Sequence, residues 1–192
     1  QRVAFRIQVY SNYAQYYSFS FTEPWVGGKK PIAMNFGVSH SRNAAYNTER
    51  TSPDYYRMDI TRFFIGLSNR LKLPDDYFYM TNTLSYERYY VDNYAYIALM
   101  DSGTANSISY TFALGRNSLD APIYPRTGSE MLFSAQFTPP YSLFGHKNYN
   151  DISNNERFKM LEFHKWKFNF SQFVNIVENL VLSARVKFGF LG

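Results

Sequence analysis

Apolar and polar residues alternate along much of the chain, which is the pattern of β-strands that present one apolar face. The alternation predicts strands near residues 3–10, 17–22, 32–39, 56–67, 78–90, 107–115, 130–137, 165–170 and 180–190. No stretch has the period of a convincing amphipathic helix. We therefore expect an all-β protein of about nine strands.

The alternation changes phase once, inside the fourth predicted strand. Met58 and Ile60 occupy even positions, whereas Phe63 and Ile65 occupy odd ones. One extra residue in a strand moves the following side chains to the opposite faces. The sequence therefore predicts a β-bulge near Arg62.

The segments between the predicted strands form a short set and a long set. The short set comprises residues 24–31, 71–76, 117–128 and 171–179, and the long set comprises residues 40–54, 91–106 and 139–158. Consecutive strands of a meander run in opposite directions, so alternate connections lie at the same end. Outer-membrane barrels have this form, with short periplasmic turns and long extracellular loops. The pattern predicts an antiparallel up-and-down transmembrane β-barrel.

Composition also favours a membrane-facing surface. Aromatic residues make up 20% of the chain and charged residues only 18%, so much of the aromatic surface must face something apolar. No apolar run approaches the roughly 18 residues of a spanning helix. The alternative is a soluble β-sandwich, whose strands alternate in the same way. The barrel is favoured because the aromatic faces exceed what one small core could hold and the long connections share one side.

Some apolar positions are candidates for contact with membrane lipid, since lipid-facing and lumen-facing residues alternate along barrel strands. These candidates are Phe5, Ile7, Phe19, Phe36, Tyr110, Phe112, Phe133, Phe168, Val186 and Phe188. Their polar neighbours along each strand would face water or a plug.

The third short connection is rich in residues that favour tight turns. Asn117 and Asp120 can accept hydrogen bonds from nearby backbone amides, and Gly128 can adopt a positive φ. We expect Asp120 to bond within the turn, because turn aspartates usually bond to backbone. The alternative is an ion pair with a lumenal arginine such as Arg116 or Arg185.

Residues that could carry chemistry are sparse. His40, His146 and His164 lack the spacing of metal ligands, and we find no arrangement of a nucleophile with a base. The net charge of +5 is scattered without a basic run, which disfavours nucleic acid as a partner. Cysteine is absent, which removes disulfides and thiolate metal sites. The sequence predicts no catalytic, metal-binding or cofactor-binding residues.

Three segments resemble characteristic parts of the BamA family of outer-membrane protein assembly factors. The first comprises Asn117, Leu119, Asp120, Tyr124, Pro125 and Gly128, the second Thr22, Glu23, Pro24 and Trp25, and the third residues 64–78. The resemblance covers nearly the whole chain. It implies that residues 1–192 belong to one barrel of about sixteen strands, from about the third strand to about the eleventh. The POTRA domains, the first and last strands and the lid loop of that family would lie outside this chain.

The resemblance implies non-enzymatic insertion of β-barrel proteins into the bacterial outer membrane. The expected partners are outer-membrane lipid, nascent barrel proteins and the accessory lipoproteins of an assembly complex. This part of the barrel would form the wall opposite a lateral seam, where clients pair with an exposed strand edge. Two alternatives share the pattern: a passive diffusion channel, and another superfamily member such as a translocation and assembly module or a partner-secretion transporter.

Overall fold

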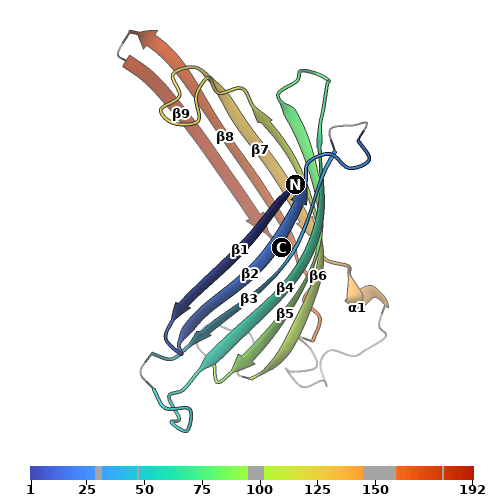
Figure 1. Ribbon diagram of the computed structural model, residues 1–192, viewed down its shortest axis with the longest axis vertical. Coiled ribbons are helices and arrows are strands. Elements are labelled where there is room, and N and C mark those ends of the chain that lie inside the picture. The colour runs from blue at the N-terminus through green and yellow to red at the C-terminus, as the bar shows by residue number, and fades with distance from the viewer. Residues whose placement is uncertain (29–31, 47, 95–101, 145–158, 179) are drawn as a thin grey trace.

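The computed structural model describes residues 1–28, 32–46, 48–94, 102–144, 159–178 and 180–192. In this part of the chain, nine strands form one antiparallel sheet in chain order, which confirms the predicted all-β, up-and-down meander (Figure 1). The strands are β1 (Arg2–Tyr10), β2 (Ala14–Glu23), β3 (Ile32–Ala44), β4 (Arg57–Arg70), β5 (Phe78–Asp92), β6 (Gly103–Asn117), β7 (Gly128–Phe137), β8 (His164–Val177) and β9 (Leu180–Leu191).

Helical structure in the described residues is limited to one turn, α1 (Tyr141–Phe144). Within the same residues, no helix combines the length and the apolar character that a membrane span requires.

The connections sort to opposite ends of the sheet. Those that follow β2, β4, β6 and β8 leave from the end that is uppermost in Figure 1, and those that follow β1, β3, β5 and β7 leave from the other end. We call these the short-turn end and the long-linker end. The connection after β1 is short although it lies at the long-linker end.

Cross-strand pairing divides the side chains into two faces, because paired residues of neighbouring strands point to the same side of a sheet. One row of the ladder consists of Phe5, Phe19, Val38, Phe63, Tyr86 and Ile108. We call the side that carries this row the apolar face and the other side the polar face. By the same register, all the residues predicted to contact lipid lie on the apolar face. They are Phe5, Ile7, Phe19, Phe36, Tyr110, Phe112, Phe133, Phe168, Val186 and Phe188.

Aromatic side chains on the apolar face contact one another across strands but stay largely uncovered. The ring centroids of Phe5 and Phe19 lie 5.0 Å apart, yet Phe5 is 74% exposed and Phe188 is 63% exposed. The buried apolar side chains among the described residues are Ala44, Ala45, Val91, Ala105 and Ala135. A β-sandwich would bury its aromatic face against a second sheet. The single sheet with an open apolar face therefore excludes the sandwich alternative.

The polar face carries a layer of hydrogen-bonded side chains. Ser85 and Ser109 are fully buried there and accept hydrogen bonds from Arg62 (3.4 Å) and Gln136 (3.0 Å). Arg62 also forms an ion pair with Glu87 at 3.2 Å. The short side chains of Ser85 and Ser109 thus lie beside longer polar ones that satisfy them. This face is suited to contact water, whereas the opposite face is not.

The apolar stretch shifts along the strands from β3 to β8. The row that contains Phe36 on β3 reaches His164 on β8. On β8 the apolar residues Trp166, Phe168 and Phe170 lie closer to the short-turn end than this row does. Strands of a barrel are tilted, so a level membrane crosses each successive strand at a shifted row. The stagger is therefore the one that a level apolar band on a tilted barrel requires.

Several strands extend further than the alternation predicts, and β3 and β8 run furthest past a predicted strand end. β3 continues to Ala44, although a linker is predicted from residue 40, and β8 continues to Val177, although a connection is predicted from residue 171. The pairing of β8 with β9 includes a register shift between Asn175 and Val177. Alternation reveals a strand only where its two faces differ in polarity, whereas backbone hydrogen bonding continues beyond that part.

The predicted β-bulge near Arg62 is wrong. β4 pairs with β3 and with β5 in a continuous register past this residue. Asp59 and Thr61 lie on the same face as Phe63, so this face changes from apolar to polar toward the long-linker end. The change of phase in the sequence marks where the apolar band stops and does not require an extra backbone residue.

The predicted contact of the apolar face with lipid can be tested at two consecutive residues of β6. Phe112 and Thr111 lie on opposite faces. Phe112→Arg is expected to lower the unfolding free energy of the full-length protein in lipid vesicles by about 2–4 kcal/mol, the cost of arginine near the bilayer midplane. Thr111→Arg serves as the matched control and is expected to cost much less. Denaturant titration measures both, and equal losses would contradict the assignment of the faces.

Candidate functional site

The hairpin between β6 and β7 is held by its own polar side chains. The carboxylate of Asp120 accepts hydrogen bonds from the backbone amides of Arg126 (3.0 Å) and Thr127 (3.2 Å). The amide oxygen of Asn117 accepts one from the backbone amide of Leu119 (3.1 Å). The bonds from Thr127 and Arg126 lower the pKa of Asp120. Asp120 thus bonds within the turn, the arrangement that its position in the sequence favours.

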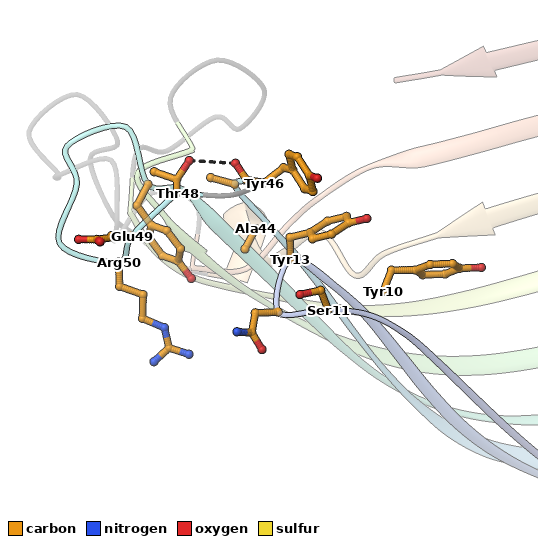
Figure 2. A pocket seen from close by; sticks show the side chains of 11 residues that line it. Tyr10, Ser11, Tyr13, Ala44, Tyr46, Thr48, Glu49 and Arg50 are labelled. Carbon is orange, nitrogen blue, oxygen red and sulfur yellow. Dashed lines mark hydrogen bonds between the residues drawn. The ribbon is translucent and has the colours of Figure 1, made fainter.

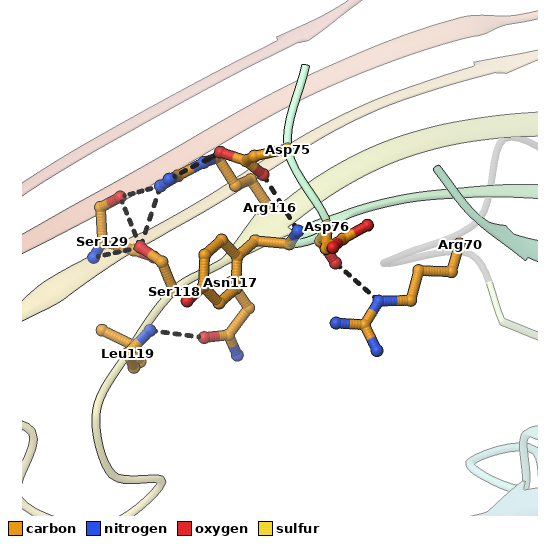
Figure 3. A network of polar contacts seen from close by, with 9 residues as sticks. Arg70, Asp75, Asp76, Arg116, Asn117, Ser118, Leu119 and Ser129 are labelled. Atoms are coloured by element: carbon orange, nitrogen blue, oxygen red, sulfur yellow. Dashed lines mark hydrogen bonds and ion pairs between the residues drawn. The ribbon is translucent and has the colours of Figure 1, made fainter. Parts of the chain in front are cut away.

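Arg116 links this hairpin to the turn between β4 and β5 (Figure 3). Its guanidinium donates to the carboxylate of Asp75 at 2.9 Å and to the hydroxyls of Ser118 (2.9 Å) and Ser129 (2.7 Å). The alternative partners for Asp120 are Arg116 and Arg185. Arg116 is engaged with Asp75 instead, and among the described residues no ion pair joins Asp120 to Arg185. The sequence places Asp75 and Arg116 at the same end of the meander, yet only the strand register shows that they meet.

Gly128 occupies a position that a larger residue would strain. Its φ is +103°, and a Cβ at this position would lie 2.2 Å from the backbone oxygen of Ser118. The backbone amide of Ser118 donates to the carbonyl of Ser129 at 2.9 Å, which closes the hairpin at the same point. Close approach of two backbones together with a positive φ explains why glycine fits here.

The tip of the hairpin is open. Tyr124 is 90% exposed, and its φ is +55°. Tyr124 and Pro125 line a hollow of about 520 Å³, together with Phe173 of β8 and Arg185 of β9. The six hairpin residues of the family resemblance therefore lie together, at the short-turn end.

The second family segment ends β2 at the same end of the sheet. Glu23 is the last residue of the strand, and its carboxylate accepts a hydrogen bond from the backbone amide of Trp25 at 3.4 Å. Thr22 pairs with Asn35 of β3, and the residues Pro24 and Trp25 lead into the following turn, with Trp25 60% exposed. Among the described residues, no hydrogen bond or ion pair joins this segment to the β6–β7 hairpin.

A hollow at the long-linker end was not found from the sequence (Figure 2). It has a volume of about 760 Å³ and lies between the turn after β1 and the residues that follow β3. Tyr13 and Tyr46 meet there edge to face, with ring centroids 4.9 Å apart, and Glu49 and Arg50 also line it. The tyrosines come from two linkers that show no alternation, so no pattern in the sequence indicates that they meet.

The structural role of the Asp120 carboxylate can be tested by mutation. Asp120→Ala is expected to slow barrel assembly, because it removes the acceptor for two backbone amides. Since the folded-state pKa of Asp120 is lowered, its contribution to stability is present above the unfolded-state pKa and is lost as pH falls through the folded-state value. The heat-modifiable gel mobility of the newly made protein, followed over time, measures assembly. Asp76→Ala, in the exposed β4–β5 turn, is the control, and equally fast assembly of both variants would refute a structural role for the Asp120 carboxylate.

Comparisons with known proteins agree with this architecture. The Omp85 superfamily domain matches residues 1–192. Among solved structures, the crystal structure of BamA from Haemophilus ducreyi lacking POTRA domains 1–3 aligns with a TM-score of 0.65 at 15% sequence identity. This match covers 93% of the chain and 33% of that chain, so the chain spans about a third of the length of this BamA. No curated protein sequence matches the chain.

The resemblance to the BamA family is therefore confirmed by the superfamily match and by the fold of the barrel. The nine-stranded meander, its open apolar face and the stagger of that face are features of an outer-membrane barrel. The chain belongs to the Omp85 superfamily of outer-membrane β-barrel insertases and transporters.

Proposed function

We propose that the chain forms part of the barrel wall of a BamA-like insertase, which helps nascent β-barrel proteins enter the bacterial outer membrane. The observation that carries this proposal is the alignment of 93% of the chain with the BamA structure, within a superfamily match over the full chain. Residues 1–192 would belong to one transmembrane domain of about sixteen strands. The proposed partners are outer-membrane lipid, nascent β-barrel proteins and the accessory lipoproteins of an assembly complex.

The proposed mechanism uses backbone pairing and no enzymatic step. An unpaired strand edge in lipid leaves N–H and C=O groups unsatisfied, and a client strand can satisfy them by adding to the sheet. In the described sheet, each of β2 to β8 is paired on both sides. This segment would therefore act as a rigid wall, so that opening of the barrel is confined to a seam elsewhere.

The central strands are longer than a bilayer requires. β3, β4, β5 and β6 contain 13 to 15 residues, whereas about 9–11 tilted residues span a bilayer. On the apolar face of β4, the residues nearest the long-linker end are polar. The residues beyond the length that a bilayer requires therefore lie at that end. We propose that this end is extracellular and that the short-turn end is periplasmic, as in other outer-membrane barrels.

A passive diffusion channel is the second candidate. The observation that favours it is the line of cationic side chains on the polar face of β8 and β9, where Lys167, Lys187 and Arg185 would face a wet lumen. Rings of charged side chains inside a barrel select ions and solutes. A translocation and assembly module or a partner-secretion transporter would use the same wall with different partners.

Depletion of the full-length protein in its native bacterium tests the insertase proposal. Several unrelated outer-membrane barrels are expected to fall together in the membrane fraction, with unfolded forms accumulating in the periplasm. Quantitative immunoblotting of each fraction measures this. Restoring the protein from a plasmid is the control. Normal barrel levels together with altered uptake of small solutes would favour the channel and reject the insertase.

Single cysteines test the proposed orientation, since this chain contains none of its own. Thr51 lies in an exposed linker at the long-linker end, and Lys72 is exposed at the short-turn end. In a full-length protein without other cysteines, Thr51→Cys is expected to react with a membrane-impermeant maleimide on intact cells and Lys72→Cys only after the outer membrane is opened. The reverse labelling would overturn the orientation.

A further inference from the structure

A basic cluster borders the apolar face at the long-linker end of β3, β4 and β5. Its members are His40, Arg42, Arg57, Asp59 and Arg88. By register they lie on the apolar face, and His40 and Arg88 each pair with Thr61. The next row toward the short-turn end contains Val38, Phe63 and Tyr86. The first basic row therefore lies only two residues, or about 7 Å along each strand, from the apolar band.

A buried carboxylate holds two of the arginines in place. The side chain of Asp59 is 11% exposed and accepts hydrogen bonds from Arg42 Nε (3.0 Å) and Arg57 Nε (3.0 Å). Arg57 also lies over the ring of Tyr90, with the guanidinium carbon 5.5 Å from the ring centroid. Each guanidinium has five N–H donors, and no described residue accepts from Nη1 of Arg42 or of Arg57. Two orientated arginines thus keep donors available.

Arg88 adds a third cation to the same surface. Its side chain is exposed, and within the described ranges no carboxylate forms an ion pair with it. Arg88 lines a surface hollow of about 250 Å³ together with His40, Arg57, Asp59, Thr61 and Tyr90. Nδ1 of His40 lies 3.0 Å from the hydroxyl of Thr61, which fixes the ring at the edge of this hollow.

The charges of the basic cluster do not balance. Arg42, Arg57 and Arg88 carry three positive charges, whereas Asp59 and the adjacent Asp92, which pairs with Arg57 on the same face, carry two negative charges. Unbalanced charge is costly beside a medium of low dielectric constant, unless a counter-ion is bound. An anion that sits where the apolar band ends would remove this cost. In a membrane, the phosphate of a lipid head group occupies that depth, and the acyl chains of the same molecule lie along the band.

We propose that the basic cluster binds the phosphate group of a membrane lipid head group. The planar guanidinium matches phosphate oxygens in bidentate geometry. The guanidinium groups of Arg57 and Arg88 line the hollow, and Arg42 lies beside it, paired with Asp59. The acyl chains would lie along the row of Val38, Phe63 and Tyr86. The inference rests on the proposed contact of the apolar face with lipid, and the proposed orientation assigns the lipid to the outer leaflet.

Lipid binding to the full-length protein in neutral detergent tests the proposal. The probes are lipid A with its phosphates and lipid A from which the phosphates have been removed, and native mass spectrometry measures how much of each the protein retains. Arg88→Gln is expected to lower the affinity for the phosphorylated lipid about tenfold, the effect of one charge-assisted hydrogen bond. Arg88→Lys is expected to restore part of the loss, because it keeps the charge without the planar fork.

Arg126→Gln is the matched control, because it removes the same charge from an exposed residue at the short-turn end. It is expected to leave lipid A retention unchanged. Equal retention of the two lipids, or an equal loss in Arg88→Gln and Arg126→Gln, would overturn the proposal. Retention of inorganic phosphate without retention of phosphorylated lipid A would show that a free anion is the ligand and would also reject a lipid site.

The failure of this proposal can be separated from failure of the lipid contact on which it rests. If Phe112→Arg destabilises the protein in vesicles while neither lipid A is retained, the apolar face meets lipid and the basic cluster alone has been misassigned. If Phe112→Arg and Thr111→Arg cost the same, the lipid contact itself is wrong. Heat-modifiable mobility of every variant shows that the loss of binding does not arise from an unfolded barrel.

Discussion

The hydrogen bonding of the backbone is the constraint on which this structure depends. Lipid offers no partner to an N–H or C=O group, so a strand in a bilayer must find its partners in neighbouring strands. The meander meets this requirement for β2 to β8, each of which is paired on both sides. β1 and β9 have one neighbour each in the described sheet. A closed barrel is the arrangement of strands that leaves no unpaired edge.

Once the backbone is satisfied, the two faces are free to differ. The apolar face exposes aromatic and aliphatic side chains such as Phe5 and Phe188, whereas the polar face buries Ser85 and Ser109 among longer polar groups. In water such a surface would favour aggregation, because it presents a large apolar patch. In a membrane the same face would be in contact with lipid acyl chains. A single sheet with one open apolar face therefore suits a membrane protein and not a soluble one.

The two ends of the sheet differ in how they are stabilised. At the short-turn end, backbone amides bond to Asp120, and Arg116 joins two neighbouring turns through Asp75. At the long-linker end, charged groups appear on the face that is apolar further along, and Asp59 holds Arg42 and Arg57 beside the end of the apolar band. One end is thus fixed by bonds within and between its turns, and the other carries charged side chains where the apolar band ends.

The turn residues show which contacts could be found from the sequence. Asp120 and Gly128 were assigned correctly because their partners lie within the same hairpin, where residue type and spacing decide the geometry. The ion pair of Arg116 with Asp75 was missed because it joins two connections 41 residues apart. Its formation depends on the register of β5 with β6, and alternation does not determine which residues of two strands pair.

The sequence by itself determined the strand order, the all-β class and, except in the first half of β4, the side of each strand that is apolar, because alternation has a period of two and a meander follows chain order. The tertiary structure decided where each strand ends. β3 and β8 continue past their alternating parts, and the phase change at Arg62 is a change in the polarity of one face and not a bulge. Backbone pairing is indifferent to side-chain polarity, so only the paired strands reveal that Arg42, Asp59 and Arg88 meet beside the apolar band.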